Sequence, residues 1–446
     1  MNSAERGGSH GARRGAWRRA AAAALLLAVA VSGGCAPSSR GDDVTTIRFW
    51  GMGREGEVVA ELIAEFERDN PDIRVRTQQI PWTAAHEKLL TAYVGNATPD
   101  VAQLGNTWVA EFAAIRALEP LDERIAASAD IAPAGYFPGI WDTNVVNDTT
   151  WGVPWYVDTR VLFYRTDLLA AAGYESMPET WPEWMEAMRA LKRQMGPDGY
   201  AIFLPTNEWA QPALFGLQSG SGLLTADGRH GVFSEPSFRQ GFEFYLNLFR
   251  EDLAPPLGHH DVTNPYQEMG RGFFAMWITG PWNLGEFRTR LPPELQDSWA
   301  TAPMPGPTGV ESGISLAGGA SLVVFRASRH RDAAWRLVEF LSRPEQQLRF
   351  YELTGSLPAR TEAWEQSDLA TARLTRAFWE QLQRVEPLPA VPEIESIMSR
   401  LIEHSEAAIR GGATAERVLT DMDRDTDRIL EKRRWLLDRN GGVPQP

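Results

Sequence analysis

The sequence predicts an α/β protein of two lobes, each built on a mostly parallel sheet flanked by helices. A strand-like alternation at Thr46–Trp50 precedes a helical apolar stripe at Glu57–Phe66. A second alternating run, Ile73–Thr77, precedes a helix-like segment at Ala84–Tyr93 and an apolar run at Val101–Leu104. Strands that alternate with helices in this way are typical of sheets covered by helices.

The later elements predict a second lobe followed by a return to the first. Gly152–Arg165 is strand-like, because it is rich in aromatic and β-branched residues. Residues 166–300 contain helical stretches and are assigned to the second lobe, before the Pro- and Gly-rich connector Thr301–Gly309. The elements expected after it are a strand at Ser321–Phe325, a helix at Ala333–Leu341 that stops near Pro344, a helix at Glu393–Arg410 and a helix that begins after Thr414 and runs to about Leu437.

Composition excludes several classes of function. The chain has 446 residues, a length that suggests two or three domains, and a net charge of −14. An acidic chain is repelled by phosphate backbones, so we expect no nucleic-acid partner. One cysteine can form neither an internal disulfide nor a Cys-rich metal site. The 17 tryptophans against 9 tyrosines are unusual, and their positions therefore matter.

The first 34 residues predict a secretory signal peptide. An arginine cluster precedes the apolar run Ala20–Val31, which is shorter than the ~20 residues that span a bilayer as a helix. Val31-Ser32-Gly33-Gly34-Cys35 then resembles the lipobox of bacterial lipoproteins, although Ser32 stands where an aliphatic residue is usual. We expect Cys35 to be acylated and residues 35–44 to form a lipid-anchored linker at the cell envelope. An accidental cysteine in an ordinary signal peptide is the alternative.

Gly51–Gly56 fits the G-x-G-x-x-G pattern between a predicted strand and a predicted helix. A dinucleotide site would also need an acidic residue near the end of the next strand, which here reads Arg74 to Gln79 without one. An exported protein has little access to nicotinamide cofactors. The preferred interpretation is a tight turn that lets a ligand approach the backbone, with Glu55 and Glu57 beside it.

Tyr156, Asp158 and Arg160 are two residues apart and share one face of an extended chain. An aromatic ring beside a carboxylate and a guanidinium suits a sugar, because the ring stacks on C–H groups while the charged groups bind hydroxyls. The alternative is a structural Asp–Arg pair on a solvated strand.

Several tryptophans lie near predicted carboxyl ends of strands, where open α/β sheets bind ligands. Core packing is the alternative for each of them. Gly318-Gly319 precedes an apolar strand and predicts either a close backbone approach or a simple turn. These belong to a set of six tryptophans in turn-like contexts, which comprises Trp50, Trp82, Trp108, Trp209, Trp277 and Trp282.

No catalytic motif is recognisable. The sequence contains neither G-x-S-x-G nor H-E-x-x-H, and His259-His260-Asp261 in a Pro- and Gly-rich loop is interpreted as a solvated cluster. No carboxylate spacing indicates a glycosidase pair. We therefore predict a binding protein, with no enzyme activity, cofactor or metal. A secreted glycosidase acting on α-glucans is the alternative.

The order of short motifs resembles the bacterial extracellular solute-binding proteins of ABC sugar importers, in the branch of maltose- and trehalose-binding proteins. The resemblance covers residues 45 to 437. It is carried by Ile47–Trp50, Glu57–Phe66, Asn70-Pro71, Pro99-Asp100-Val101, Leu118-Glu119-Pro120-Leu121, Gly152-Val153-Pro154 through Tyr164-Arg165, Thr180-Trp181, Gly280-Pro281-Trp282 and Ala302-Pro303-Met304-Pro305-Gly306.

The resemblance implies a type II periplasmic-binding-protein fold, in which the chain crosses a hinge more than once and sugar binds in a central cleft. The implied N-terminal lobe comprises residues 45–157 plus about 303–343. The implied C-terminal lobe comprises residues 158–302 plus about 344–440.

The same resemblance implies the ligand-binding residues. The family's Gly-Gly-aromatic element reads Gly318-Gly319-Ala320 here, which removes one stacking wall, and Asn106 stands where relatives often have Asp. The implied set is Glu55 or Glu57, Asn106 with Trp108, Tyr156, Asp158 and Arg160 at the first crossover, Trp282, and Arg360 in Leu357-Pro358-Ala359-Arg360, to which Trp82 and Gly319 are added.

The function implied is that of a monomeric lipoprotein that binds an α-glucosidic di- or oligosaccharide and delivers it to permease subunits. Maltose, trehalose and maltooligosaccharides are the expected sugars. A second alternative keeps the fold but changes the ligand to a phosphorylated polyol or an oligopeptide.

Overall fold

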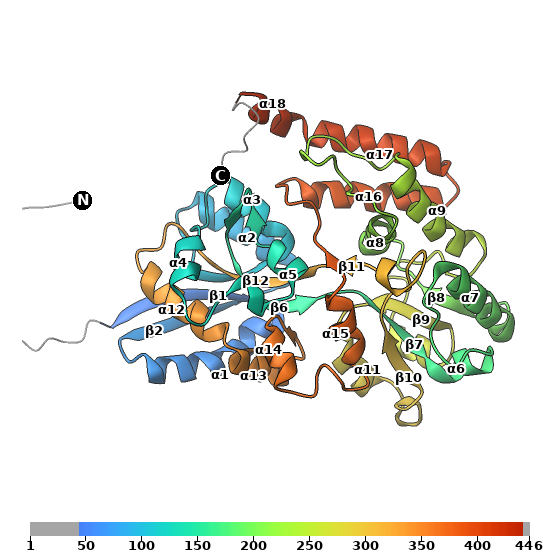
Figure 1. Cartoon of the computed structure of the whole chain (residues 1–446), viewed down its shortest axis with the longest axis horizontal. Helices are drawn as coiled ribbons and strands as arrows, with labels where there is room; N and C mark the ends of the chain where they lie inside the picture. Colours follow the sequence, from blue (N-terminus) through green and yellow to red (C-terminus); the bar gives the residue numbers. More distant parts are fainter. Residues whose placement is uncertain (1–43, 440–446) are drawn as a thin grey trace, which may run out of the picture. The chain divides into compact units, whose positions relative to one another are not determined.

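The computed structural model describes residues 44–439, so the predicted signal peptide, Cys35 and the predicted linker up to residue 43 lie outside the described residues. Two large sheets organise this part of the chain, one of six strands and one of four (Figure 1). No helix within 44–439 has both the length and the apolar character needed to cross a membrane.

The first sheet has the strand order β13-β6-β12-β3-β1-β2. β1 pairs in parallel with β2 and β3, whereas β12 is antiparallel to both β3 and β6, and β13 is antiparallel to β6. We call this sheet and its helices the first lobe. Its strands are β1 (Thr45–Met52), β2 (Ile73–Ile80), β3 (Val101–Gly105), β6 (Val153–Asp158), β12 (Gly318–Val324) and β13 (Leu357–Pro358).

The second sheet has the order β10-β7-β9-β8 and is the centre of the second lobe. Only β8 and β9 are parallel. Its strands are β7 (Val161–Arg165), β8 (Tyr200–Phe203), β9 (Phe274–Thr279) and β10 (Trp299–Ala302); two small sheets pair β11 (Ser315–Leu316) with β14 (Val385–Glu386) and β4 (Val145–Val146) with β5 (Thr149–Thr150).

The sheets are mixed rather than mostly parallel, and the route of the chain explains why. The chain leaves the first sheet along β6, and only Thr159 and Arg160 separate β6 from β7 in the second sheet. It returns along β12 beside β6, so the outgoing and returning strands run in opposite directions. The α/β class and the two sheets predicted from the sequence are confirmed.

The chain passes between the sheets a third time after β13. α15 contacts β7 and β10, and β14 pairs with β11 from the second passage. The exact limits of the two lobes stay a prediction. One stretch that was predicted to belong to the C-terminal lobe lies instead beside the first sheet. α13 packs on α1 and β13 pairs with β6, so residues 344–358 adjoin the first sheet and not the second.

Helices cover both sheets. Around the first sheet lie α1 (Gly53–Asp69), α2 (Trp82–Val94), α3 (Val109–Ala114), α4 (Asp122–Ala127), α5 (Pro138–Asp142), α12 (Arg331–Leu341), α13 (Pro344–Thr354) and α14 (Thr361–Glu365). The second lobe contains α6 (Thr166–Ala171), α7 (Trp181–Met195), α8 (Ala210–Gln218), α9 (Pro236–Arg250), α10 (Pro265–Gly270), which contacts β9, α11 (Asn283–Arg290), α15 (Arg376–Leu382), α16 (Ile394–Ile409), α17 (Ala415–Ile429) and α18 (Glu431–Arg439). Short 3-10 turns are η1 (Asn106–Trp108), η2 (Pro133–Gly135), η3 (Pro293–Leu295) and η4 (Val310–Ser312).

Strand alternation in β1 supplies two core faces. Ile47 and Phe49 belong to the cluster that includes residues of α1 and α12. Trp50 and Met52 face the opposite way and belong to the cluster with α2 and α3. The sheet is therefore covered on both sides.

Two helix ends differ from expectation for local reasons. Pro344 begins α13 instead of merely following a helix, as proline suits the first helical turn. The last predicted helix is divided at Leu430 into α17 and α18. Thr414 caps α17 as predicted, since its side chain accepts a hydrogen bond from the Arg417 backbone N–H at 3.3 Å.

Candidate functional site

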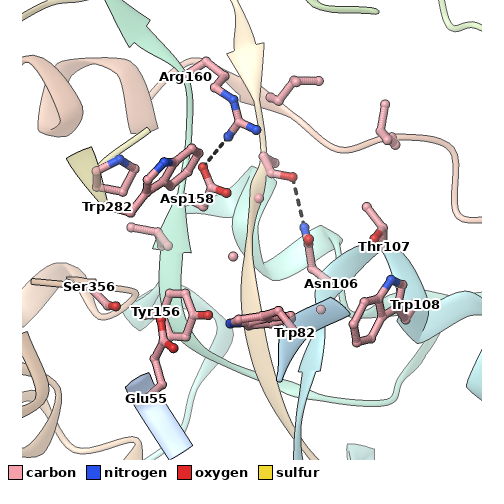
Figure 2. A pocket seen from close by; sticks show the side chains of 18 of the residues that line it. Glu55, Trp82, Asn106, Thr107, Trp108, Tyr156, Asp158, Arg160, Trp282 and Ser356 are labelled. Atoms are coloured by element: carbon pink, nitrogen blue, oxygen red, sulfur yellow. Dashed lines mark hydrogen bonds and ion pairs between the residues drawn. The ribbon is translucent and has the colours of Figure 1, made fainter. Parts of the chain in front are cut away.

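A cavity of about 560 Å³ is lined by residues of both lobes (Figure 2). Nine of the predicted site residues line it. They are Glu55, Trp82, Asn106, Trp108, Tyr156, Asp158, Arg160, Trp282 and Gly319.

The turn between β1 and α1 places Glu55 at the cavity. A Cβ on Gly56 would lie 2.4 Å from the Gly51 carbonyl oxygen, so only glycine allows the strand and helix to approach this closely. Gly53 has a φ of 51°, a left-handed conformation. Burial raises the pKa of the Glu55 carboxyl, although hydrogen bonds with Trp82 and Ser356 oppose the shift. The glycine pattern therefore serves a tight turn, as the sequence interpretation preferred.

Tyr156 projects from β6 with its hydroxyl fixed by a buried glutamine. Gln103 Nε2 donates to Tyr156 Oη at 3.0 Å, while Gln103 Oε1 accepts from the Met52 backbone N–H at 2.7 Å. Because Tyr156 Oη accepts from Gln103, its own O–H can donate to a ligand. Burial, with the charges of Glu55 and Asp158, raises the pKa of Tyr156 well above its ordinary value, so the phenol stays protonated.

Residues 106–108 follow β3 and form the η1 turn. Asn106 Nδ2 donates to the Ala317 carbonyl oxygen at 3.0 Å, and Thr107 Oγ1 donates to Glu395 Oε1 of α16. Trp108 makes an edge contact with Trp82, with ring centroids 5.7 Å apart. This turn therefore connects the first sheet with the segment before β12 and with a helix of the second lobe.

Arg160 is held between two carboxylates. Its Nη1 donates to Asp158 Oδ1 at 2.6 Å, and its Nη2 donates to Glu208 Oε1 at 3.3 Å. Burial raises the pKa of Asp158, and the charge of Glu208 adds to the rise while Arg160 opposes it. Burial acts against the charged form of Arg160, but the two carboxylates outweigh it and raise the pKa of Arg160. The guanidinium is therefore a permanent cation at the cavity wall.

Trp282 presents an indole to the cavity and stacks on this cation. Its side chain is 49% exposed, and Arg160 Cζ lies 4.6 Å from the ring centroid (Figure 2). A Cβ on Gly280 would lie 1.9 Å from the Trp282 ring. Gly280 thus gives the indole room to fold back over the turn.

Gly318 and Gly319 bring β12 close to β6. A Cβ on Gly319, which has a φ of 134°, would lie 2.2 Å from the Tyr156 carbonyl oxygen. A Cβ on Gly318 would lie 2.7 Å from the Asp158 carbonyl oxygen. Of the two expectations for this pair, the close backbone approach is confirmed.

The structure corrects the prediction for two residues. Glu57 is exposed on α1, next to the inward-facing Gly56, and does not line the cavity. Arg360 is buried elsewhere in the first lobe, where its Nη1 donates to the Asp130 and Ser342 carbonyl oxygens at 2.6 and 3.2 Å. These contacts give Arg360 a structural role in the first lobe.

Sequence reasoning missed several contributors late in the chain, among them Ser356 and Leu388 from loops and Glu395 from α16. No motif marks them. Leu388 and Glu395 reach the cavity only after the third passage between the lobes, and Ser356 reaches it from the loop between α13 and β13. Among the tryptophans, Trp209 lines the cavity whereas Trp50 and Trp277 are buried in the core.

The chemistry of the cavity is that of recognition. Four indoles and one phenol offer flat faces, and carboxylate, amide, hydroxyl and guanidinium groups offer hydrogen bonds. Within residues 44–439, no group of three His, Cys, Asp or Glu side chains is arranged to hold a metal ion.

Comparison with known proteins agrees with this geometry. Residues 52–348 match the family model described as bacterial extracellular solute-binding protein. A solved structure of the sugar-binding protein MalE from Xanthomonas citri is 48% identical, covers 88% of this chain and 99% of its own, and superposes with a TM-score of 0.86.

Two relatives extend the comparison. An uncharacterised lipoprotein of Streptomyces antibioticus is 28% identical, over 82% of this chain and 81% of its own length. The maltotriose-binding protein of Pyrococcus abyssi is 22% identical, over 77% of this chain and 72% of its own length.

Proposed function

The chain belongs to the bacterial extracellular solute-binding protein family, and from this premise we propose that it captures an α-glucosidic di- or oligosaccharide for an ABC importer. Membership confirms the resemblance found in the sequence. It also confirms a binding role in place of catalysis, since the family consists of solute-binding proteins. Maltose, trehalose and short maltooligosaccharides are the proposed sugars.

The observation that carries the proposal is the lining of the cavity. Tyr156 and Trp282 offer flat aromatic faces, and Asp158 and Arg160 lie beside them. A pyranose has apolar C–H faces and a rim of hydroxyls, so it can stack and hydrogen bond in one site. The similar MalE of Xanthomonas citri is a sugar-binding protein, and the similar Pyrococcus abyssi protein is named for maltotriose.

Hinge closure is the proposed mechanism. The cavity takes Glu55, Trp82 and Tyr156 from the first lobe and Trp209 and Trp282 from the second, while three passages of the chain connect the lobes. A sugar that contacts both walls stabilises the closed form relative to the open one. The permease would then recognise the closed, loaded form.

The family is extracellular, which agrees with the predicted export of this chain. We further propose that Cys35 carries the lipid anchor and that the protein acts as a monomer at the membrane surface; the similarity to a lipoprotein of Streptomyces antibioticus supports the anchor. Cys35→Ala is expected to move the protein from the membrane fraction to the soluble fraction of fractionated cells.

A thermal-shift screen over neutral sugars, phosphorylated polyols and oligopeptides tests the proposed ligand. A ligand at 100 times its Kd raises the free energy of unfolding by about 2.7 kcal/mol and so raises the Tm. We expect maltose, trehalose or a maltooligosaccharide to give the largest shift, and chromatography to recover the sugar unchanged. A shift confined to the other solutes would reject the sugar, and hydrolysis of an α-glucan would reject the receptor.

A further inference from the structure

Glu208 lies behind the cavity, between β8 and α8, and is absent from the cavity lining. We propose that Glu208, held by His259 and Gln211, is a positioning residue that fixes the Arg160 guanidinium over Trp282 and so sets how Asp158 meets a bound sugar. The part that concerns sugar rests on the proposed function.

The Glu208 carboxylate is held from three segments. Its Oε1 accepts from Arg160 Nη2 at 3.3 Å, and its Oε2 accepts from Gln211 Nε2 of α8 at 3.1 Å. His259 Nε2 lies 3.1 Å from the same Oε2. The loop carrying His259 is itself fastened, because the His259 backbone N–H donates to Asn207 Oδ1 at 2.8 Å. The side chain of Glu208 is only 18% exposed, so these contacts restrict it strongly.

The orientation of Arg160 depends on few contacts. Its Nη groups bind Asp158 and Glu208, its plane lies over Trp282, and its buried Nε has no hydrogen-bond partner among the described residues. A planar guanidinium is oriented by paired acceptors and an aromatic face, rather than by charge alone. Without the Glu208 charge, only Asp158 would direct the hydrogen bonds of Arg160.

Because Arg160 donates to both Asp158 and Glu208, Glu208 affects which oxygen of Asp158 is left free for a ligand. Asp158 Oδ1 accepts from Arg160, whereas Oδ2 accepts no hydrogen bond from residues 44–439. While Glu208 takes one end of the guanidinium, Arg160 cannot close on both oxygens of Asp158. Asp158 Oδ2 therefore stays available to a ligand hydroxyl, and Trp282 keeps its stacking position.

The first test needs no sugar. The indole N–H resonance of Trp282, assigned by its loss in Trp282→Phe, reports the cation above the ring. We expect Glu208→Gln to move this resonance toward its position in Arg160→Lys. The matched control is Asp167→Asn, which breaks another carboxylate–arginine pair, with Arg165 at 2.6 and 2.8 Å, away from the cavity.

If Glu208→Gln folds and the chemical shift of the Trp282 indole N–H is the same as in the parent, the proposal is overturned. If that variant does not fold, Glu208→Asp keeps the charge but shortens its reach, and it is expected to move the same resonance. An unmoved resonance in Glu208→Asp then overturns the proposal equally.

The second test is calorimetry with maltose and with trehalose. Glu208→Gln is expected to weaken binding about tenfold, the size of one hydrogen bond to a charged group, while Asp167→Asn leaves affinity unchanged. In an Arg160→Lys background the same change should cost little, because Glu208 acts through Arg160. An equal loss in both backgrounds rejects positioning. If the parent protein binds no neutral sugar, the proposed function fails, whereas the Trp282 resonance still decides the role of Glu208.

Discussion

The two walls of the cavity are held in place by different physical means. The first-lobe wall is fixed by hydrogen bonds into the sheet, such as that from Gln103 to Tyr156 at 3.0 Å, and by the contact of Trp82 with Trp108. The wall that faces the second lobe is fixed by charge, since Arg160, in the link between β6 and β7, lies between Asp158 at the end of β6 and Glu208 and over the Trp282 ring of the second lobe.

The difference predicts how each wall responds to change. Neutral hydrogen bonds contribute about 0.5–1.5 kcal/mol each and depend little on salt or pH, whereas bonds to charged groups contribute about 1.5–3 kcal/mol. We therefore expect substitutions at the charged wall to have the larger effects and to depend on pH.

The largest effect is expected for Asp158→Ala. The change removes the carboxylate proposed to bind a sugar hydroxyl and leaves Arg160 paired with Glu208 alone. A loss of about 1.5–3 kcal/mol corresponds to about 10- to 150-fold in Kd, measured by calorimetry with the sugar found in the screen. Burial raises the pKa of Asp158, which means that the folded protein disfavours the charged form of this side chain. The neutral variant Asp158→Asn is therefore expected to retain the Tm of the parent. Unchanged affinity in Asp158→Ala would remove Asp158 from the site.

Gly280→Ala should come next. The added Cβ would lie 1.9 Å from the Trp282 ring and must displace it. Overpacking of this kind costs about 1–3 kcal/mol, so we expect an affinity loss of about tenfold by calorimetry. Gly285→Ala in α11 is the matched control, because its Cβ would meet nothing within 4 Å. Equal affinities of the two variants would show that the position of Trp282 is irrelevant to binding.

Low pH should weaken the charged wall, because it protonates the carboxylate of Glu208 that binds Arg160. Burial acts to raise the pKa of Glu208, but His259, Arg160 and Gln211 outweigh it and lower that pKa from 4.5 to about 2. A carboxyl with a lowered pKa stabilises the fold above its unfolded pKa, and that stabilisation is lost as the pH falls toward 2. Asp158, with its raised pKa, takes up a proton before Glu208 does.

The Tm difference between the parent and Glu208→Gln is therefore expected to be full at pH 6 and to shrink between pH 4.5 and pH 2.5, as followed by circular dichroism. His259 faces the same carboxylate and its protonated form adds a positive charge there. A difference that stays constant over this range would contradict the lowered pKa.

Local sequence patterns predicted the fold well where adjacent residues determine structure. The alternation at Thr46–Trp50 became β1, and Thr414 became the cap of α17. Antiparallel pairing was missed, because it follows from the return of the chain beside β6 and not from any local pattern.

The same distinction applies to the site. Tyr156 and Asp158 share a face of β6, and Arg160 follows in the link to β7, so sequence spacing alone was enough to predict that all three meet at the cavity. Glu395 and Ser356 lie more than 190 residues from Asp158 in sequence and reach the cavity only through tertiary packing. The family resemblance implied that Arg360 binds the ligand. The Asp130 and Ser342 carbonyl oxygens instead bind its side chain away from the cavity.

The smallest effect is expected at the neutral wall, for Tyr156→Phe. The variant removes one hydroxyl and leaves Gln103 Nε2 without its acceptor. We expect about a 2- to 12-fold loss of sugar affinity, from about 0.5–1.5 kcal/mol for a neutral hydrogen bond. Since the pKa of Tyr156 is well above its ordinary value, this loss should be the same at pH 7 and pH 9. Tyr164→Phe, outside the cavity, is the control. A loss as large as that of Asp158→Ala would show that the neutral wall, and not the charged one, dominates recognition.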